Sequence, residues 1–121
     1  MSKTVLLIED EPNIIEAISF ILSRDGWTVA THSNGHDAND AILRRKPDLV
    51  ILDVMLPGKS GFDILRDLRQ DAQFQDLPVL ILTARGQTKD RELAQSLGVS
   101  RFMTKPFSNA DVLAAANDLV P

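Results

Sequence analysis

Three short stretches of the chain are almost entirely apolar: residues 5–8, 49–52 and 79–82. Stretches this short and without polar positions predict strands that are buried on both faces, as in a parallel sheet covered by helices. Two more mixed stretches, residues 27–31 and 99–103, predict less buried strands nearer the edges of the sheet.

Between these stretches, apolar residues recur at spacings of three and four, which predicts amphipathic helices. The segment 37–45 has the weakest pattern, because Asn39 and Asp40 interrupt its apolar face. The other four helical faces comprise Ile14, Ile15, Ile18, Ile21 and Leu22; Ile64, Leu65 and Leu68; Leu93, Ala94 and Leu97; and Val112, Leu113, Ala116 and Leu119.

Glycine, proline and serine mark the boundaries of these elements. Gly26 and Gly98 are placed to end the first and fourth helices, since glycine accepts a left-handed backbone. Pro47 and Pro78 precede strands and stop helix propagation. Ser108 is a suitable N-cap for the last helix.

The chain therefore alternates strand and helix five times. Such alternation predicts an α/β fold with a doubly wound parallel sheet, right-handed crossovers and helices on both faces. A length of 121 residues suits one domain, and we expect a single domain over residues 1–121.

Composition excludes several classes of protein. With no cysteine, the chain has no disulfide scaffold or thiolate metal site, which fits a reducing compartment. The net charge of −4 argues against direct nucleic-acid binding by this domain. No apolar run is long enough to span a bilayer, and the N-terminus lacks a signal-peptide pattern, so we expect a cytoplasmic protein without a membrane partner.

Polar residues gather where the predicted strands end, and ligands of doubly wound sheets bind beyond these carboxyl ends. These residues are Glu9, Asp10 and Glu11 after the first strand, Asp53 after the third, Thr83 after the fourth, and Thr104 and Lys105 after the fifth.

The set has a coherent chemistry. Glu9, Asp10 and Asp53 repel one another when ionised, and a hard divalent cation such as Mg²⁺ offsets that repulsion. Lys105 adds a second positive charge and Thr83 a hydroxyl donor. A cation, an ammonium and a hydroxyl together suit a transferring phosphoryl group.

Taken singly, each residue has an ordinary explanation. Asp53 could cap a turn, residues 9–11 could complement a helix dipole, Thr83 could be a cap and Lys105 a solvated lysine. Their common position at one end of one sheet favours the chemical interpretation.

Four segments resemble the motifs of response-regulator receiver domains: residues 5–12 (VLLIEDEP), 47–58 (PDLVILDVMLPG) followed by Gly61, 80–84 (LILTA) and 102–107 (FMTKPF). The resemblance covers essentially the whole chain in order. It implies a flavodoxin-like sheet of five parallel strands in the order 2-1-3-4-5, with five helices.

The resemblance also implies roles for individual residues around a Mg²⁺ or Mn²⁺ ion. Asp53 matches the phosphoacceptor and Asp10 the chief metal carboxylate, with Glu9 binding through water. The backbone carbonyl of Met55 matches a metal ligand. Met55 and Arg85 occupy positions that tune dephosphorylation in the family.

Further positions match the part of the family site that responds to phosphorylation. Thr83 would hydrogen-bond the phosphoryl group, Lys105 would pair with it, and the Lys105–Pro106 peptide bond is expected to be cis. Ala84 leaves the acceptor open. Phe102 matches an aromatic residue that moves inward, so Thr83 and Phe102 form the implied switch.

In the implied function, the phosphohistidine of a sensor histidine kinase or histidine phosphotransfer protein donates its phosphoryl group to Asp53. The surface of the fourth helix, fifth strand and fifth helix then changes and controls a downstream protein. Such a domain is not a conventional enzyme: at most it phosphorylates itself from small donors and slowly loses the group.

The chain begins at Met1 and stops at Pro121, after the last helix, so we expect a single-domain regulator or part of a longer one. The winged-helix branch of the family usually pairs acids at the start of the fifth strand with an arginine on the fifth helix. Here the strand has Ser100 and Arg101, and residues 110–118 of the predicted helix contain no arginine, so we do not expect a dimer of that type.

Three other functions compete with this interpretation. A dehalogenase-type phosphatase would need a second acid where Met55 stands. A nucleotide- or flavin-binding module would need a glycine-rich loop after the first strand, where the acidic residues 9–11 and Pro12 stand instead. An interaction module that takes no phosphate stays open, because possession of the site does not show its use.

Overall fold

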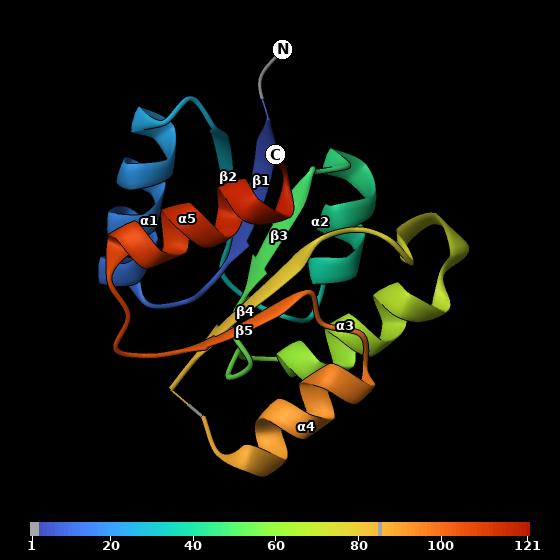
Figure 1. The fold of residues 1–121 in the computed structure, drawn as a ribbon. Helices are drawn as coiled ribbons and strands as arrows, with labels where there is room; N and C mark the ends of the chain where they lie inside the picture. Colours follow the sequence, from blue (N-terminus) through green and yellow to red (C-terminus); the bar gives the residue numbers. More distant parts are fainter. Residues whose placement is uncertain (1–2, 85) are drawn as a thin grey trace.

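The sheet has five parallel strands in the order β2-β1-β3-β4-β5, as expected (Figure 1). The computed structural model describes residues 3–84 and 86–121. Its elements are β1 (Thr4–Ile8), α1 (Pro12–Arg24), β2 (Thr28–His32), α2 (Ala38–Arg45), β3 (Leu49–Leu52), α3 (Gly61–Gln70), a 3₁₀ turn (Ala72–Phe74), β4 (Val79–Thr83), α4 (Thr88–Ser96), β5 (Arg101–Thr104) and α5 (Asn109–Leu119).

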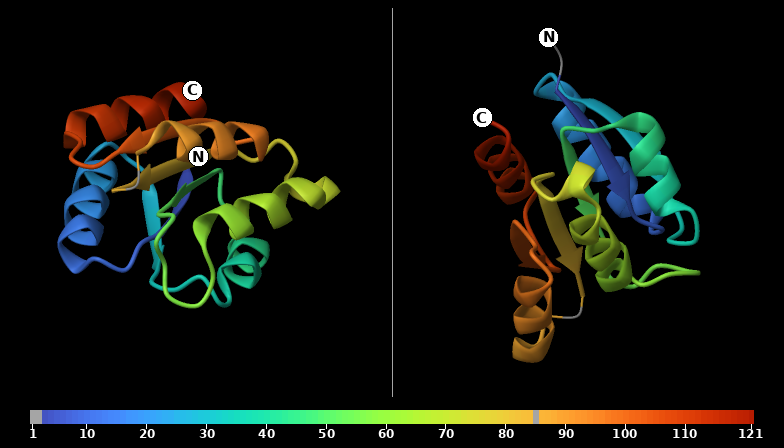
Figure 2. Two further views of the ribbon diagram at one scale, coloured as in Figure 1. Left: turned by 90° about the horizontal axis from the view of Figure 1, so that it is seen from below. Right: turned by 90° about the vertical axis from the view of Figure 1, so that its right-hand side faces the viewer.

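Helices cover both faces of this sheet. Helices α1 and α5 lie side by side over one face, whereas α2 and α3 pack together over the other face (Figures 1 and 2). Along β1, Val5 and Leu7 belong to the core under α1 and α5, while Leu6 and Ile8 belong to the core under α2, α3 and α4. The alternation arises because successive strand side chains point to opposite faces. It confirms that the apolar runs are strands buried on both sides.

Two strands begin later than the sequence predicts, and the ends of the preceding helices explain why. Gly26 and Gly98 take positive φ angles of 96° and 90°. The next residues, Trp27 and Val99, then donate their N–H groups back to helix carbonyls, as in a Schellman ending. The predicted starts at residues 27 and 99 are therefore wrong: β2 starts at Thr28 and β5 at Arg101.

Helix α4 also departs from its predicted apolar face. Ala94 is fully buried, but the Leu93 side chain is 43% exposed. The helix is short and mostly polar, so only a narrow strip of it contacts the sheet. At α5, by contrast, the expected cap is confirmed, since the Ser108 hydroxyl accepts the Asp111 N–H at 3.0 Å.

The 3₁₀ turn after α3 has no counterpart in the sequence prediction. It starts where the Asp71 carboxylate accepts the Gln73 N–H at 2.9 Å, and it buries Phe74. No helix within residues 3–84 and 86–121 combines the length and apolar character needed to cross a membrane.

Replacing the two helix-ending glycines tests their conformational role. Gly26→Ala should lose about 1–2 kcal/mol of unfolding free energy, because its Cβ meets nothing within 4 Å and only the left-handed backbone is strained. Gly98→Ala should lose about 1 kcal/mol more, since its Cβ would press on Arg69, which donates to the Gly98 and Phe74 carbonyls. Urea unfolding measures both losses, and equal losses would contradict the role given to Arg69.

Candidate functional site

The carboxyl ends of β1, β3 and β5 bring three charged residues to one edge of the sheet. The Asp53 N–H donates to the Ile8 carbonyl at 3.0 Å and so continues the ladder between β3 and β1. The Lys105 N–H donates to the Thr83 carbonyl at 2.8 Å, beyond β5. The side chains of Glu9, Asp53 and Lys105 therefore meet just past the sheet.

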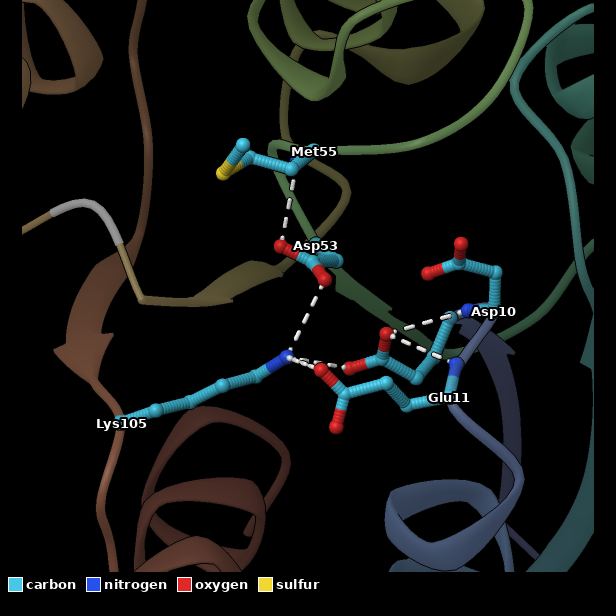
Figure 3. A network of polar contacts seen from close by, with 6 residues as sticks. Asp10, Glu11, Asp53, Met55 and Lys105 are labelled. Carbon is cyan, nitrogen blue, oxygen red and sulfur yellow. Dashed lines mark hydrogen bonds and ion pairs between the residues drawn. The ribbon is translucent and has the colours of Figure 1, made fainter.

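A single ammonium group connects the carboxylates of this edge. The Lys105 Nζ lies 2.9 Å from Glu9 Oε1, 3.1 Å from Asp53 Oδ2 and 3.9 Å from Glu11 Oε1. Figure 3 shows the lysine side chain reaching across toward Asp53 and Glu11. Glu9 and Asp53 are only 1% and 6% exposed. A charge-assisted bond to each of them offsets part of the cost of burying two acids.

A third acid completes a cluster of oxygen donors. Glu9, Asp10 and Asp53 can each offer one carboxylate oxygen, and these oxygens lie within 4.8 Å of one another. Asp10 is exposed, so an ion held here could keep part of its water shell. The second oxygen of Glu9 accepts the Asp10 N–H at 3.0 Å, which fixes the glutamate within the cluster. Such hard, anionic donors fit Mg²⁺.

Burial governs the protonation of Glu9. Loss of solvation raises the pKa of Glu9 to about 7, against the lowering effect of the Lys105 hydrogen bond and together with repulsion from Asp53. Burial lowers the pKa of Lys105, but the hydrogen bonds to Glu9 and Asp53 outweigh it and the pKa lies above its usual value. The lysine therefore keeps its positive charge near neutral pH, whereas burial makes ionisation of Glu9 less favourable than for a solvated glutamate.

The loop after β3 surrounds Asp53 with backbone groups. The Met55 N–H donates to Asp53 Oδ1 at 3.2 Å, while the Met55 side chain is 58% exposed (Figure 3). Gly61, at the start of α3, lies against the same backbone: a Cβ there would come within 2.3 Å of the Asp53 carbonyl oxygen. Only glycine allows α3 to start this close to the acidic residue.

Thr83 and Phe102 lie on the neighbouring strands β4 and β5. Thr83 is fully buried at the carboxyl end of β4. Phe102 is half-buried beside the core under α2, α3 and α4, and the Arg91 guanidinium lies 5.0 Å from its ring centroid. The Lys105–Pro106 peptide bond is cis. Arg85 lies outside the described residues.

A mainly apolar groove of about 540 Å³ opens beside Lys105. Ile14, Ala17 and Ile18 of α1 form one side of it. Pro106 and Phe107, from the segment between β5 and α5, form the other. The sequence pattern did not predict this groove, because its two walls are distant in the chain.

Two further contacts of the site region were not predicted. The Glu11 carboxylate lies near the Lys105 ammonium, and the only hint of this contact in the sequence was the acidic run, residues 9–11, that contains Glu11. Lys59 holds the loop after Asp53 through bonds to α2 and α3, and a lone lysine in a Pro-Gly loop gives no such signal.

Comparison with known proteins shows the family to which this chain is similar. The model of the response regulator receiver domain matches residues 5–117. The probable transcriptional regulatory protein TcrX of Mycobacterium tuberculosis is 43% identical over 110 residues, which are 91% of this chain and 46% of TcrX. The chain thus spans slightly less than half of that relative.

Solved structures of receiver domains have the same fold as this chain. The beryllofluoride-activated N-terminal receiver domain of RstA from Klebsiella pneumoniae is 32% identical, with a TM-score of 0.89 over 98% of this chain and 100% of that one. The chemotaxis response regulator CheY4 of Vibrio cholerae is similar in fold, with a TM-score of 0.91 at 24% identity over 99% and 100% of the two chains.

The raised pKa of Glu9 predicts a pH-dependent stability of the metal-free protein. Because the folded state binds this proton more tightly, the contribution of Glu9 is fully present below pH 4.5 and is lost as pH rises through about 7. Relative to Glu9→Gln, the wild type should lose on the order of 3 kcal/mol of unfolding free energy across that range. Urea unfolding with EDTA measures this, and parallel curves for the two proteins would refute it.

Proposed function

The chain belongs to the family of response regulator receiver domains, and we propose that residues 1–121 act as one unit that accepts a phosphoryl group on Asp53. Receiver domains are signalling domains of two-component systems and are phosphorylated by sensor histidine kinases. The observation that carries the proposal is the buried Asp53 carboxylate, bonded to the Lys105 ammonium beside Glu9 and Asp10.

In the proposed reaction, an Asp53 carboxylate oxygen attacks the phosphorus of a phosphohistidine in line. The bond from phosphorus to the imidazole nitrogen breaks, and its electron pair stays on that nitrogen. The product is an aspartyl phosphate on Asp53, which water later hydrolyses.

This chain's own groups disperse the charge that develops on the phosphoryl oxygens. The Lys105 ammonium, 3.1 Å from Asp53 Oδ2, is placed to move its hydrogen bonds to them. The Met55 N–H, 3.2 Å from Asp53 Oδ1, is a second donor. Mg²⁺ or Mn²⁺, held by Glu9, Asp10, Asp53 and the Met55 carbonyl, would supply further positive charge when bound.

The apolar groove beside Lys105 is the surface on which we propose that the donor protein binds. It lies between α1 and the segment before α5, and Lys105 is part of its lining. A helix of a histidine kinase or phosphotransfer protein that buries apolar residues there would bring its phosphohistidine close to Asp53.

The response to phosphorylation is proposed to pass through Thr83 and Phe102. A phosphoryl group adds roughly −1.5 to −2 of charge at Asp53. Thr83 would turn its hydroxyl toward that charge, and Phe102 would fill the space left behind. The surface of α4, β5 and α5 would then change and control a cytoplasmic protein partner, without direct contact between this domain and nucleic acid.

Acetyl phosphate tests the proposal directly. With Mg²⁺, the intact mass of the wild type should rise by one phosphoryl group, because Asp53 is the nucleophile and the cation offsets the charge. Asp53→Asn and an EDTA sample are the controls, and neither should gain mass.

Some receivers refuse small donors, so beryllofluoride binding in the presence of Mg²⁺ is the companion measurement. The wild type should bind it and Asp53→Asn should not. No adduct and no beryllofluoride binding would overturn the phosphorylation mechanism and favour an interaction module that takes no phosphate.

Removal of the lysine charge gives a graded test of its role. Lys105→Met should slow phosphorylation by acetyl phosphate about 100-fold, which is typical for loss of one donor aimed at developing charge. The rate of mass gain is the measurement, with Lys89→Met on the exposed start of α4 as the matched control. Equal rates for wild type and Lys105→Met would show that Lys105 is not needed.

A further inference from the structure

Lys59 joins the loop after Asp53 to two helices. Its Nζ donates to the Asn39 Oδ1 of α2 at 2.9 Å and forms an ion pair with Asp67 of α3. Asn39 in turn donates to the Ile64 carbonyl of α3 at 3.4 Å. The Lys59 side chain is 27% exposed, so this contact is partly shielded from water.

A second set of contacts, made by backbone atoms, holds the same loop. The Gly35 N–H, in the loop between β2 and α2, donates to the Pro57 carbonyl at 2.8 Å. The two loops approach so closely that a Cβ at Gly35 would lie 2.0 Å from the Lys59 carbonyl oxygen. The loop tip is therefore held at two points, the Pro57 carbonyl and the Lys59 ammonium.

The held loop carries the backbone groups of the proposed site. Met55 donates its N–H to Asp53, and its carbonyl is the proposed metal ligand. An open groove of about 580 Å³ runs along the loop and has Asp10, Met55, Pro57 and Lys59 in its lining. A shift of the loop tip would thus move backbone groups that face the acidic cluster.

We propose that Lys59 is a positioning residue, which holds this loop so that the Met55 backbone stays in place beside Asp53 and Asp10. The inference rests on the proposed function and deepens it. Lys59 acts through the backbone and not by touching the phosphoryl group. Because partly exposed ion pairs contribute little to global stability, its effect should appear in metal affinity more than in unfolding.

The sign of the effect separates positioning from charge. The Lys59 ammonium repels a divalent cation in the neighbouring cluster, so removal of its charge alone would strengthen Mg²⁺ binding. Loss of positioning would weaken the binding, because the Met55 carbonyl would no longer be held in place. Lys59→Met keeps much of the side-chain length but removes both the charge and the polar contacts of Lys59. The charge explanation therefore predicts tighter Mg²⁺ binding in this variant, and the positioning explanation predicts weaker binding.

The experiment is an amide NMR titration of the whole chain with Mg²⁺, for the wild type, Lys59→Met and Lys89→Met. Lys59→Met should raise the Kd for Mg²⁺ about tenfold, in the lower range for loss of a group that supports a metal ligand. Lys89→Met removes the same charge from α4 and should leave the Kd unchanged or slightly lower. The same spectra show that each variant is folded.

Two companion measurements examine the contact itself. Asp67→Asn should also raise the Kd, and adding it to Lys59→Met should change little more, because both substitutions break one ion pair. Hydrogen exchange of the loop amides of residues 54–56 and 58–60 in metal-free protein should be faster in Lys59→Met than in the wild type.

An equal or lower Kd in Lys59→Met, or unchanged loop exchange, would overturn the positioning role. A wild-type chain that binds no Mg²⁺ would overturn the proposed function as well. The wild-type titration therefore tells the two failures apart without any variant.

Discussion

A parallel sheet buried on both faces leaves room for polar side chains only at the ends of its strands. Here β1, β3 and β4 bury nearly every side chain in one of two cores, one under α1 and α5 and one under α2, α3 and α4. Because all strands run in one direction, their carboxyl ends meet at one edge. The same constraint that makes the core apolar therefore concentrates the charged residues in one place.

That concentration has an electrostatic cost. Glu9 and Asp53 are buried next to the exposed Asp10, and Lys105 supplies one positive charge to this acidic group. The pKa of Glu9 is raised mainly because burial removes its solvation, and repulsion from Asp53 raises it further. Buried ion pairs of this kind seldom favour folding over an apolar packing. The arrangement is better explained by the proposed function, in which these residues hold a divalent cation and a phosphoryl group.

Much of the proposed chemistry depends on backbone atoms of a loop, and loops are the least restrained parts of a fold. Contacts with other parts of the chain hold the loop after Asp53 in place. Gly61 lets α3 start against the Asp53 backbone, Gly35 lets a second loop approach it, and Lys59 connects it to α2 and α3. Precision at the site thus comes from elements that carry none of its reactive groups.

Local patterns in the sequence predicted the elements and the edge where the polar residues gather. Apolar runs marked the strands, and Gly26 and Gly98 marked the helix ends, since these signals depend on neighbours in the chain. The residues alone indicated a parallel sheet. Its strand order came from the resemblance to receiver domains, and the structure bears it out.

Only the tertiary structure decided which partners meet. Lys105 bonds to Glu9 and Asp53, Lys59 to Asn39 and Asp67, and the exposure of Leu93 follows from how little of α4 contacts the sheet. The late starts of β2 and β5 have a more local cause, the backbone bonds of Trp27 and Val99 back to the preceding helices, which the apolar pattern does not mark. Such contacts join residues far apart in the chain or compete with a strand for the same N–H group. Local periodicity does not encode them, because packing selects them.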